Sequence, residues 1–596
     1  MSRHPASRRC KCGLALSGAL FLVVCAELRA QQARAPDESL ELTVDVRVVS
    51  VDVVVLDRRG RPVRGLKASD FELYEDGRPV EIEHFAPPED LAREGEPRRE
   101  LAPSGAATMG APVRRAGSMA GRSTLVFLLD ERLLPPSSRR RIVDGLAAQL
   151  QEIQRHAGRL VFARHREQLE LIEPATTDRI LETVSAEAAP GAAVIRGGEL
   201  SRVVRSLIAS HEACENAPRC VPCSEQEGNW HELLQLARNH VSAEQERLGL
   251  ALDVLAELIS WLAGIDGEKL LIYPSEGLPQ QPGLEAHTFI IDLCAPLRDG
   301  VEREISSEIV QYDESRRLRT LGAWANARGV RLFPLDAVGL RGGMSNSVEF
   351  GRVDVRPSTR LDNVAKSNAE GGLHQLADET GGRAVFNSNT PLADLDLERE
   401  VAGRYSLGYV PARPPTGRRH ELRVQLASAR GLEIRHRRSF LDRTIEQRLV
   451  DELQTALRLD LERDDLNARL AFGDVTRDPE WAGLYRVPVR VILPASRLEM
   501  FDASKDGSQP HGRIRIWLGA LRDDGTPTEL RQELFTLGEG GLQPHDGTYE
   551  VTVTMPLKPG SWTVAVGARD EIAQRTSLLR GAIAVGDEVE EEEEIR

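Results

Sequence analysis

The stretch Ser123-Thr-Leu-Val-Phe-Leu-Leu-Asp130 is an unbroken apolar run that ends in an acidic residue. Central strands of a parallel sheet have this pattern, because helices cover both faces of such a sheet. The residues Pro136, Ser137 and Ser138 follow shortly afterwards and are typical of the start of a helix. In open parallel sheets, ligands bind beyond the carboxyl ends of the strands, where Asp130 is expected. The functional question is therefore whether Asp130 and its neighbours bind a ligand.

Further strand-like runs alternate with helical patterns after this first strand. The clearest helical pattern spans residues 230–262, where leucine, isoleucine and valine recur at helical spacing and predict a core-facing stripe. Alternating strands and helices predict a parallel, doubly wound sheet of the Rossmann-like kind. The further strand-like runs are 160–163, 169–172, 269–273, 330–334 and 384–386.

All-β patterns flank this α/β region, so the fold class is predicted to be multidomain, α/β plus all-β. Alternating valines before Leu56 and the turn Glu75-Asp-Gly77 predict a small antiparallel module, and short alternating strands near the C-terminus predict a β sandwich. The region after residue 400 is expected to close the α/β domain as a β hairpin. The predicted segments are a signal peptide at 1–30, a β module at 40–88, a linker at 89–122, the α/β domain at 123–443, a connecting helix at 445–460, a β sandwich at 470–587 and an acidic, disordered tail at 588–596.

The N-terminus predicts export. A basic region is followed by the apolar stretch 14–26 and by the small-residue cleavage pattern Leu28-Arg-Ala30, which together are typical of a secretory signal peptide. The apolar stretch is too short for a membrane span. The mature chain is therefore predicted to be secreted or periplasmic, with no integral membrane span after cleavage. Its formal net charge of -15 argues against nucleic acid as a partner.

The cysteines that remain after cleavage are even in number and lie in a predicted insertion of the α/β domain. In an oxidising compartment they predict two disulfides, with three connectivities left open. A zinc site that also uses His211 is the alternative, although the spacing lacks the paired Cys-x-x-Cys arms of a strong zinc motif. The disulfide candidates are Cys214, Cys220, Cys223 and Cys294.

Several sequence blocks between Val51 and Phe440 carry a family resemblance. They are Val51-Asp-Val-Val-Val-Leu-Asp-Arg-Arg-Gly-Arg-Pro-Val-Arg-Gly-Leu66, Asp70-Phe-Glu-Leu-Tyr-Glu-Asp-Gly77, Leu128-Leu-Asp130, Leu376-Ala-Asp-Glu-Thr-Gly-Gly382, Arg404-Tyr-Ser-Leu-Gly-Tyr-Val-Pro411 and Ile434-Arg-His-Arg-Arg-Ser-Phe440. In this order and spacing they resemble the von Willebrand factor A (VWA)-related family of secreted acidobacterial proteins. The resemblance implies a Rossmann-like A domain of the adhesion and integrin type, preceded by a β module.

A domains of this type often carry a metal-ion-dependent adhesion site, and the resemblance implies where its residues would lie. The family pattern combines an Asp-x-Ser-x-Ser loop with a Thr and an Asp from two other loops, donors that suit octahedral Mg²⁺. Here Asp130 is present, but Arg132 and Leu134 stand at the two serine positions. Glu199 and Glu276 stand at the positions of the Thr and the Asp. This degenerate pattern predicts no physiological metal, with Mg²⁺ binding as the alternative.

The sequence contains no Gly-x-Ser-x-Gly elbow, Walker loop or His-Glu-x-x-His motif, so no catalytic residue and no cofactor are predicted. His165 and His374 are isolated histidines, which are more often structural than catalytic. The predicted function is that of a secreted, non-enzymatic interaction protein with a protein partner. One alternative is a metal-dependent adhesin that uses Asp130, Glu199 and Glu276. The other is a hydrolase built in the insertion that carries the cysteines.

Overall fold

The structure is a computed structural model, and it describes residues 48–88, 123–156, 158–172, 176–185, 199–215, 230–294, 301–340, 357–427, 431–461, 463–501, 511–538 and 540–586. The predicted signal peptide, linker and acidic tail lie outside these residues. So do Cys220 and Cys223, and the side chains of Cys214 and Cys294 are not described either. The predicted disulfides therefore stay a prediction.

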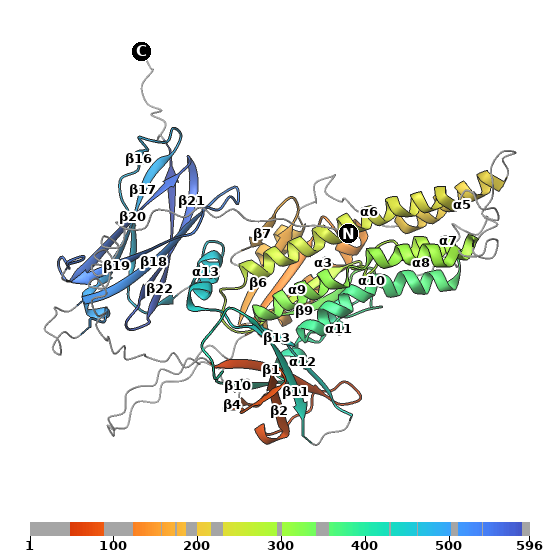
Figure 1. The fold of residues 1–596 in the computed structure, drawn as a ribbon, viewed down its shortest axis with the longest axis horizontal. Helices are drawn as coiled ribbons and strands as arrows, with labels where there is room; N and C mark the ends of the chain where they lie inside the picture. Colours follow the sequence, from red (N-terminus) through yellow and green to blue (C-terminus); the bar gives the residue numbers. More distant parts are fainter. Residues whose placement is uncertain are drawn as a thin grey trace, which may run out of the picture. The chain divides into compact units, whose positions relative to one another are not determined.

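The strand that ends at Asp130 lies in the centre of a five-stranded sheet with the order β7-β6-β5-β8-β9. Strands β6, β7 and β9 of this sheet are labelled in Figure 1. Strands β6, β5, β8 and β9 are parallel, whereas β7 returns antiparallel to β6. Every residue of β5, β8 and β9 is buried, as expected for strands covered on both faces. The strands are β5 (Thr124–Asp130), β6 (Arg159–His165), β7 (Leu169–Ile172), β8 (Lys269–Ser275) and β9 (Val330–Asp336).

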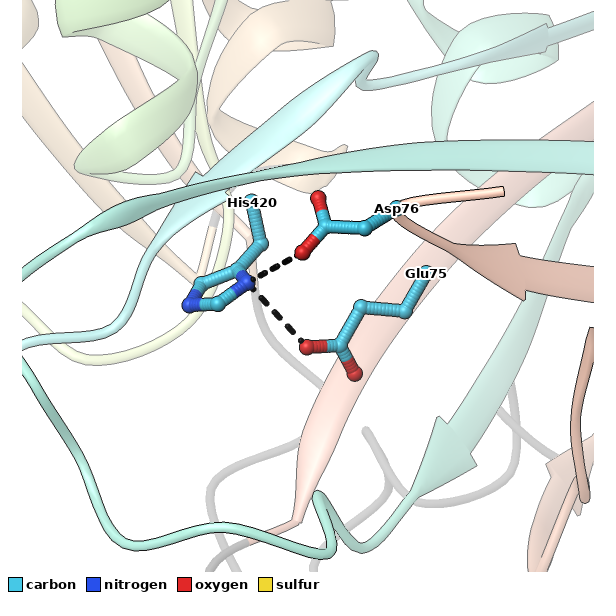
Figure 2. Close-up of side chains that lie close together, drawn as sticks. All are labelled: Glu75, Asp76 and His420. Atoms are coloured by element: carbon cyan, nitrogen blue, oxygen red, sulfur yellow. Dashed lines mark hydrogen bonds and ion pairs between the residues drawn. The ribbon is translucent and has the colours of Figure 1, made fainter. Parts of the chain in front are cut away.

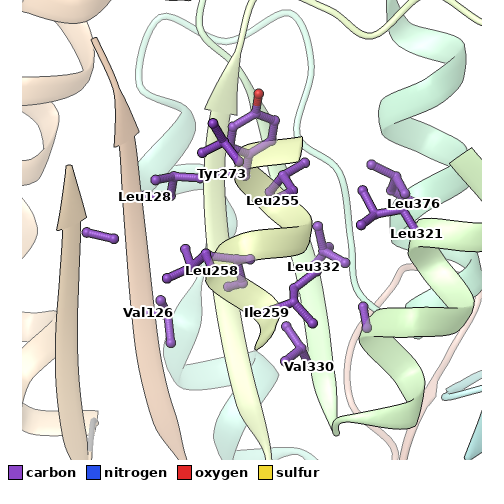
Figure 3. Packing of buried hydrophobic residues seen from close by; sticks show 14 of the residues in the cluster. Val126, Leu128, Leu255, Leu258, Ile259, Tyr273, Leu321, Val330, Leu332 and Leu376 are labelled. Atoms are coloured by element: carbon purple, nitrogen blue, oxygen red, sulfur yellow. The ribbon is translucent and has the colours of Figure 1, made fainter. Parts of the chain in front are cut away.

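Alternate residues of β5 enter two different hydrophobic cores, one on each face of the sheet. Val126 and Leu128 pack with α6, α9 and α10, where Leu255, Leu258 and Ile259 of α6 lie over the strands (Figure 3). Leu125, Phe127 and Leu129 pack on the opposite face with α3, α4 and α11. Helices therefore cover both faces, and the predicted core-facing stripe of residues 230–262 is confirmed by its burial. The helices are α3 (Pro136–His156), α4 (Thr177–Ser185), α6 (Trp230–Trp261), α9 (Ser315–Ala327), α10 (Thr359–Thr380) and α11 (Pro391–Leu395).

A separate helical core extends from this domain. Leu233 and Leu234, near the start of α6, pack with Phe289 and Ile290 of α7 and with residues of α5, α8 and α10. This core belongs to the predicted insertion. The added helices are α5 (Glu199–Glu215), α7 (Leu284–Cys294) and α8 (Val301–Ile309). No helix in the described part of the chain combines the length and the apolar character needed to cross a membrane.

The N-terminal β module is not built from residues 40–88 alone, which corrects one expectation. Strand β1 pairs with β10 and β12, and β2 pairs with β11, so strands after residue 400 complete both sheets of this module. These later strands were expected to close the α/β domain as a hairpin. They join the module because Tyr405 and Leu407 share a core with Val51 and Val53. The strands are β1 (Val49–Leu56), β2 (Phe71–Glu75), β3 (Arg78–Val80), β4 (His84–Ala86), β10 (Arg404–Tyr409), β11 (Arg419–Leu426), β12 (Glu433–His436) and β13 (Ser439–Leu441).

The C-terminal region contains two antiparallel sheets around one core. One sheet has the order β14-β22-β21-β18-β19, and the other joins β15, β17 and β16, with β20 also paired to β17. Strand β17 alternates buried and half-buried residues along its whole length, the pattern of a strand with one face in the core. Helix α13 (Ile445–Ala456) precedes these sheets and starts with a capping box between Thr444 and Gln447. The strands are β14 (Arg463–Asp464), β15 (Arg469–Phe472), β16 (Thr476–Arg477), β17 (Tyr485–Pro494), β18 (His511–Arg522), β19 (Arg531–Gly538), β20 (Thr548–Leu557), β21 (Gly560–Asp570) and β22 (Thr576–Val585).

A buried lysine at the start of β8 makes stability depend on pH. Lys269 is 2% exposed, and its Nζ donates a hydrogen bond to the carbonyl oxygen of Ile265 at 2.8 Å. Burial lowers the pKa of Lys269 from 10.5 to about 7. Between these two values the unfolded chain binds more protons than the folded chain, so this group makes the folded state more stable as the pH rises.

Replacing Lys269 by methionine is expected to remove this contribution. The difference between the urea midpoints at about pH 7.5 and about pH 9.5 should then be smaller in Lys269→Met than in the wild type, because the buried ammonium group no longer titrates. Groups that titrate elsewhere affect both proteins equally. An unchanged difference between the two midpoints would show that Lys269 is not the cause.

Candidate functional site

Asp130 lies at the carboxyl end of β5 and contacts a histidine from the neighbouring strand. The parallel register places Asp130 opposite His165, the last residue of β6. Asp130 Oδ1 lies 2.9 Å from His165 Nδ1 and accepts a hydrogen bond from the backbone N–H of Leu133 at 3.2 Å. Asp130 is 1% exposed, and its Oδ2 is buried with no hydrogen-bond partner among the described residues. The buried carboxylate thus has one oxygen paired with an imidazole and one oxygen left open.

The next residue, Glu131, is also buried and is surrounded by positive charge. Its Oε2 accepts a hydrogen bond from Arg166 Nε at 2.9 Å and lies 3.5 Å from Arg139 Nη1. Arg166 directly follows β6, and Arg139 lies in the first turns of α3, so two elements supply these cations. Glu131 is therefore neutralised within the protein and does not face a ligand as a free acid.

Glu276 follows β8 and reaches the start of α3. It accepts a hydrogen bond from the hydroxyl of Ser138 at 2.6 Å, and Ser138 is itself buried. This contact brings the loop after β8 next to the helix that follows the β5 loop, on the edge where Asp130 lies. The strand order changes direction between β5 and β8, and in open α/β sheets such a switch point is where ligands bind. Glu199 is the first residue of α5, and its side chain is not described.

The residues at this edge do not fit Mg²⁺. The ion needs several oxygen donors in octahedral geometry. Leu134 is buried in the hydrophobic core, and Arg132 brings a positive charge instead of a hydroxyl. One oxygen of Asp130 already pairs with His165. In the described part of the chain, Asp130 and Glu276 belong to no group of three candidate ligands close enough to share an ion.

Arg132 has a different environment from the arginines beside Glu131. Its side chain is half-buried in the loop after β5 and makes no hydrogen bond or ion pair with any described residue. A guanidinium without an anion beside it keeps its planar set of donors available for a carboxylate or a phosphate. The edge is therefore chemically suited to an anionic group from outside.

The importance of His165 did not follow from the sequence, which showed only an isolated histidine. The available signal was its place at the end of the second strand-like run. If β5 and β6 are assumed to be parallel neighbours in register, His165 falls beside Asp130. The pattern of apolar residues does not reveal that register by itself.

Comparisons with known proteins show no family for this chain. No family model matches it, and no curated protein matches it. A solved chain described as Northeast Structural Genomics Consortium target SoR45 aligns with 22% of this chain and 98% of its own length, at 13% identity and a TM-score of 0.15. The Bacteroides uniformis beta-glucuronidase structure aligns with 30% of this chain and 19% of its own length, at 11% identity and a TM-score of 0.14. Similarity this weak supports no argument about fold or function.

Proposed function

We propose that this chain is a secreted, non-enzymatic interaction protein built on a degenerate VWA-like domain. Across the sheet of its α/β domain, the strands lie in the order β7, β6, β5, β8 and β9. Numbered by their place in the chain, this order is 3-2-1-4-5, which is how the doubly wound order begins. The antiparallel direction of β7, the helices on both faces and the ordered sequence blocks support a VWA-like domain. The signal-peptide pattern of the N-terminus supports export.

The proposed interaction is direct recognition of an acidic side chain of a protein partner by Arg132. The observation that carries this proposal is that the half-buried side chain of Arg132 makes no hydrogen bond or ion pair with the described residues. Arginine presents its donors in a planar fork that matches a carboxylate bidentately. In the metal-dependent form of this site, the cation would attract such a carboxylate. Here Arg132 would take over that role without a metal.

Two other candidate functions make different predictions. A metal-dependent adhesin is favoured by one observation, the buried Asp130 Oδ2 without a hydrogen-bond partner in the described residues. A hydrolase would use the pair of Asp130 and His165 as an acid–base unit. However, no serine, threonine or cysteine among the described residues hydrogen-bonds to His165, so that pair has no nucleophile in contact.

Reversing the charge of Arg132 is expected to weaken partner binding roughly 30-fold or more, because removing one member of a buried charge pair costs about 2–5 kcal/mol. The mature wild-type chain and Arg132→Glu would be used as baits for exported proteins of the same cell. The affinity of each protein captured by the wild type would then be measured with both baits. Binding of the specific partner should be lost in Arg132→Glu and unchanged by EDTA.

Arg140→Glu is the matched control, since Arg140 lies nearby on α3, is exposed and makes no hydrogen bond or ion pair with described residues. It should bind the partner like the wild type. Binding that is abolished by EDTA would favour the metal-dependent adhesin instead. Equal binding by wild type, Arg132→Glu and Arg140→Glu would contradict the proposed role of this edge.

A further inference from the structure

Two adjacent carboxylates lie on the same side of the turn between β2 and β3. Glu75 ends β2, and Asp76 and Gly77 form a two-residue turn in which both residues have positive φ, 48° and 77°. Neighbouring side chains in a strand point to opposite faces. The left-handed conformation of Asp76 breaks this alternation, so both carboxylates face the same ring of His420 (Figure 2).

His420 comes from β11, which pairs with β2 although the whole α/β domain separates the two strands in sequence. His420 Nδ1 lies 2.8 Å from Asp76 Oδ2 and 3.3 Å from Glu75 Oε1. The backbone N–H of Glu421 donates to Asp76 Oδ1 at 2.9 Å. This bond lowers the pKa of Asp76.

The rest of the environment holds the imidazole ring in one orientation. The ring of His420 is stacked on Phe440, with centroids 5.3 Å apart and planes inclined by 25°. On the far side of the ring, His420 Nε2 lies 3.9 Å from Oδ2 of Asp442, which is buried. Histidines that bind metal through one nitrogen usually direct the other toward a carboxylate, which fixes the tautomer and the ring orientation. Asp442 lies on the side of the ring where such a carboxylate is expected. At 3.9 Å its Oδ2 is beyond hydrogen-bond distance of Nε2, and it accepts a hydrogen bond from the backbone N–H of Thr416 at 3.0 Å.

His420 Nδ1 and Asp76 Oδ2 are within hydrogen-bond distance, and Glu75 Oε1 lies beside the same nitrogen as a second acceptor. Nδ1 carries at most one hydrogen, and the two carboxylates compete for it. Around a tetrahedral Zn²⁺ with ligands at about 2.0–2.1 Å, ligand atoms lie about 3.4 Å apart. The distance from Nδ1 to Glu75 Oε1 is close to this value, whereas the distance to Asp76 Oδ2 is that of a hydrogen bond and is shorter. All three candidate ligand atoms lie within 4.8 Å of one another. A small outward movement of Asp76 would make room for the ion.

We propose that Glu75, Asp76 and His420 form a Zn²⁺ site. One imidazole and two carboxylates suit Zn²⁺ better than Mg²⁺, which prefers oxygen ligands only. The side chains are 15–50% exposed, so an ion can enter from solvent. Bound Zn²⁺ would link the β2–β3 turn to β11 and stabilise the β module, because a ligand that binds only the folded state favours that state.

Calorimetric titration of ZnCl₂ into the metal-free mature chain tests this site. Asp76→Asn is the decisive variant, since asparagine tolerates the left-handed conformation and should preserve the turn. The wild type should show saturable binding and a rise in Tm with Zn²⁺. Asp76→Asn should weaken that binding by more than about tenfold, the lower limit seen when only an outer partner of a metal ligand is removed. Excess Mg²⁺ should not compete.

His545→Ala is the matched control, because His545 also lies beside an aspartate, at 3.3 Å from Asp546, but both side chains are almost fully exposed. It should bind Zn²⁺ like the wild type. A site elsewhere, for example one made of cysteines, would be unaffected by Asp76→Asn. The proposal is wrong if the wild type shows no saturable binding, or if Asp76→Asn binds Zn²⁺ with wild-type affinity.

Discussion

Replacing Glu400 by alanine is expected to destabilise the junction between the β module and the α/β domain by about 3–5 kcal/mol. Glu400 lies in α12 (Leu397–Ala402), is completely buried and pairs with three arginines. The carboxylate oxygens of Glu400 lie 3.0 Å from Nη2 of Arg435 in β12, 3.2 Å from Nε of Arg383 and 3.5 Å from Nη2 of Arg331 in β9. Removing this carboxylate takes away the buried negative charge beside Arg331 and Arg435, whose side chains are only 6% and 11% exposed.

Glu433→Ala is a suitable control, because Glu433 lies 3.7 Å from the same Arg435 but its side chain is 63% exposed. An exposed ion pair contributes at most about 1 kcal/mol. Native-state hydrogen exchange of the amides in β9 and β12 would measure both effects, since a chain with several domains has no single unfolding free energy. Equal protection in the two variants would contradict the importance of Glu400.

Gly382→Ala is expected to destabilise the α/β domain by more than about 3 kcal/mol, at or beyond the usual upper range for overpacking. A Cβ atom on Gly382 would lie 1.8 Å from the carbonyl oxygen of Leu332 in β9. That oxygen belongs to the backbone of a fully buried strand, so it cannot move aside as a flexible side chain would. The neighbouring Gly381 ends α10 in the left-handed conformation, with φ of 72°, which leads the chain into this close approach.

A comparison with Gly267→Ala distinguishes the cost of steric overlap from the cost of a strained backbone conformation. Gly267 has a φ of +81°, but a Cβ atom there would meet no atom within 4 Å. Its replacement should cost only the conformational penalty, about 1–2 kcal/mol. Soluble yield and thermal unfolding of the purified chains would compare the two variants. If Gly382→Ala loses no more stability than Gly267→Ala, the close approach of Gly382 to β9 is not important for stability.

The apolar patterns were sufficient to predict the local elements that form the carboxyl edge of the sheet at Asp130. The run 123–130 required a strand covered on both faces, and β5 is buried along its whole length. Because that strand ends in an acid, Asp130 had to lie at the carboxyl edge of the sheet. The Asp-Gly pair after Glu75 predicted a tight turn, and positive φ is found at both positions. These features depend on residues close together in the sequence.

Only the tertiary structure decided which of these elements meet. Alternating residues indicate which face of a strand is buried, but not which strand lies beside it or in what register. Thus β1 pairs with β10, although the α/β domain lies between them in the sequence. In the same way, His165 lies beside Asp130 and His420 lies beside Asp76. Each contact joins segments far apart in the chain, and each depends on packing of the whole core. The candidate sites therefore arise from long-range register, which local sequence patterns do not encode.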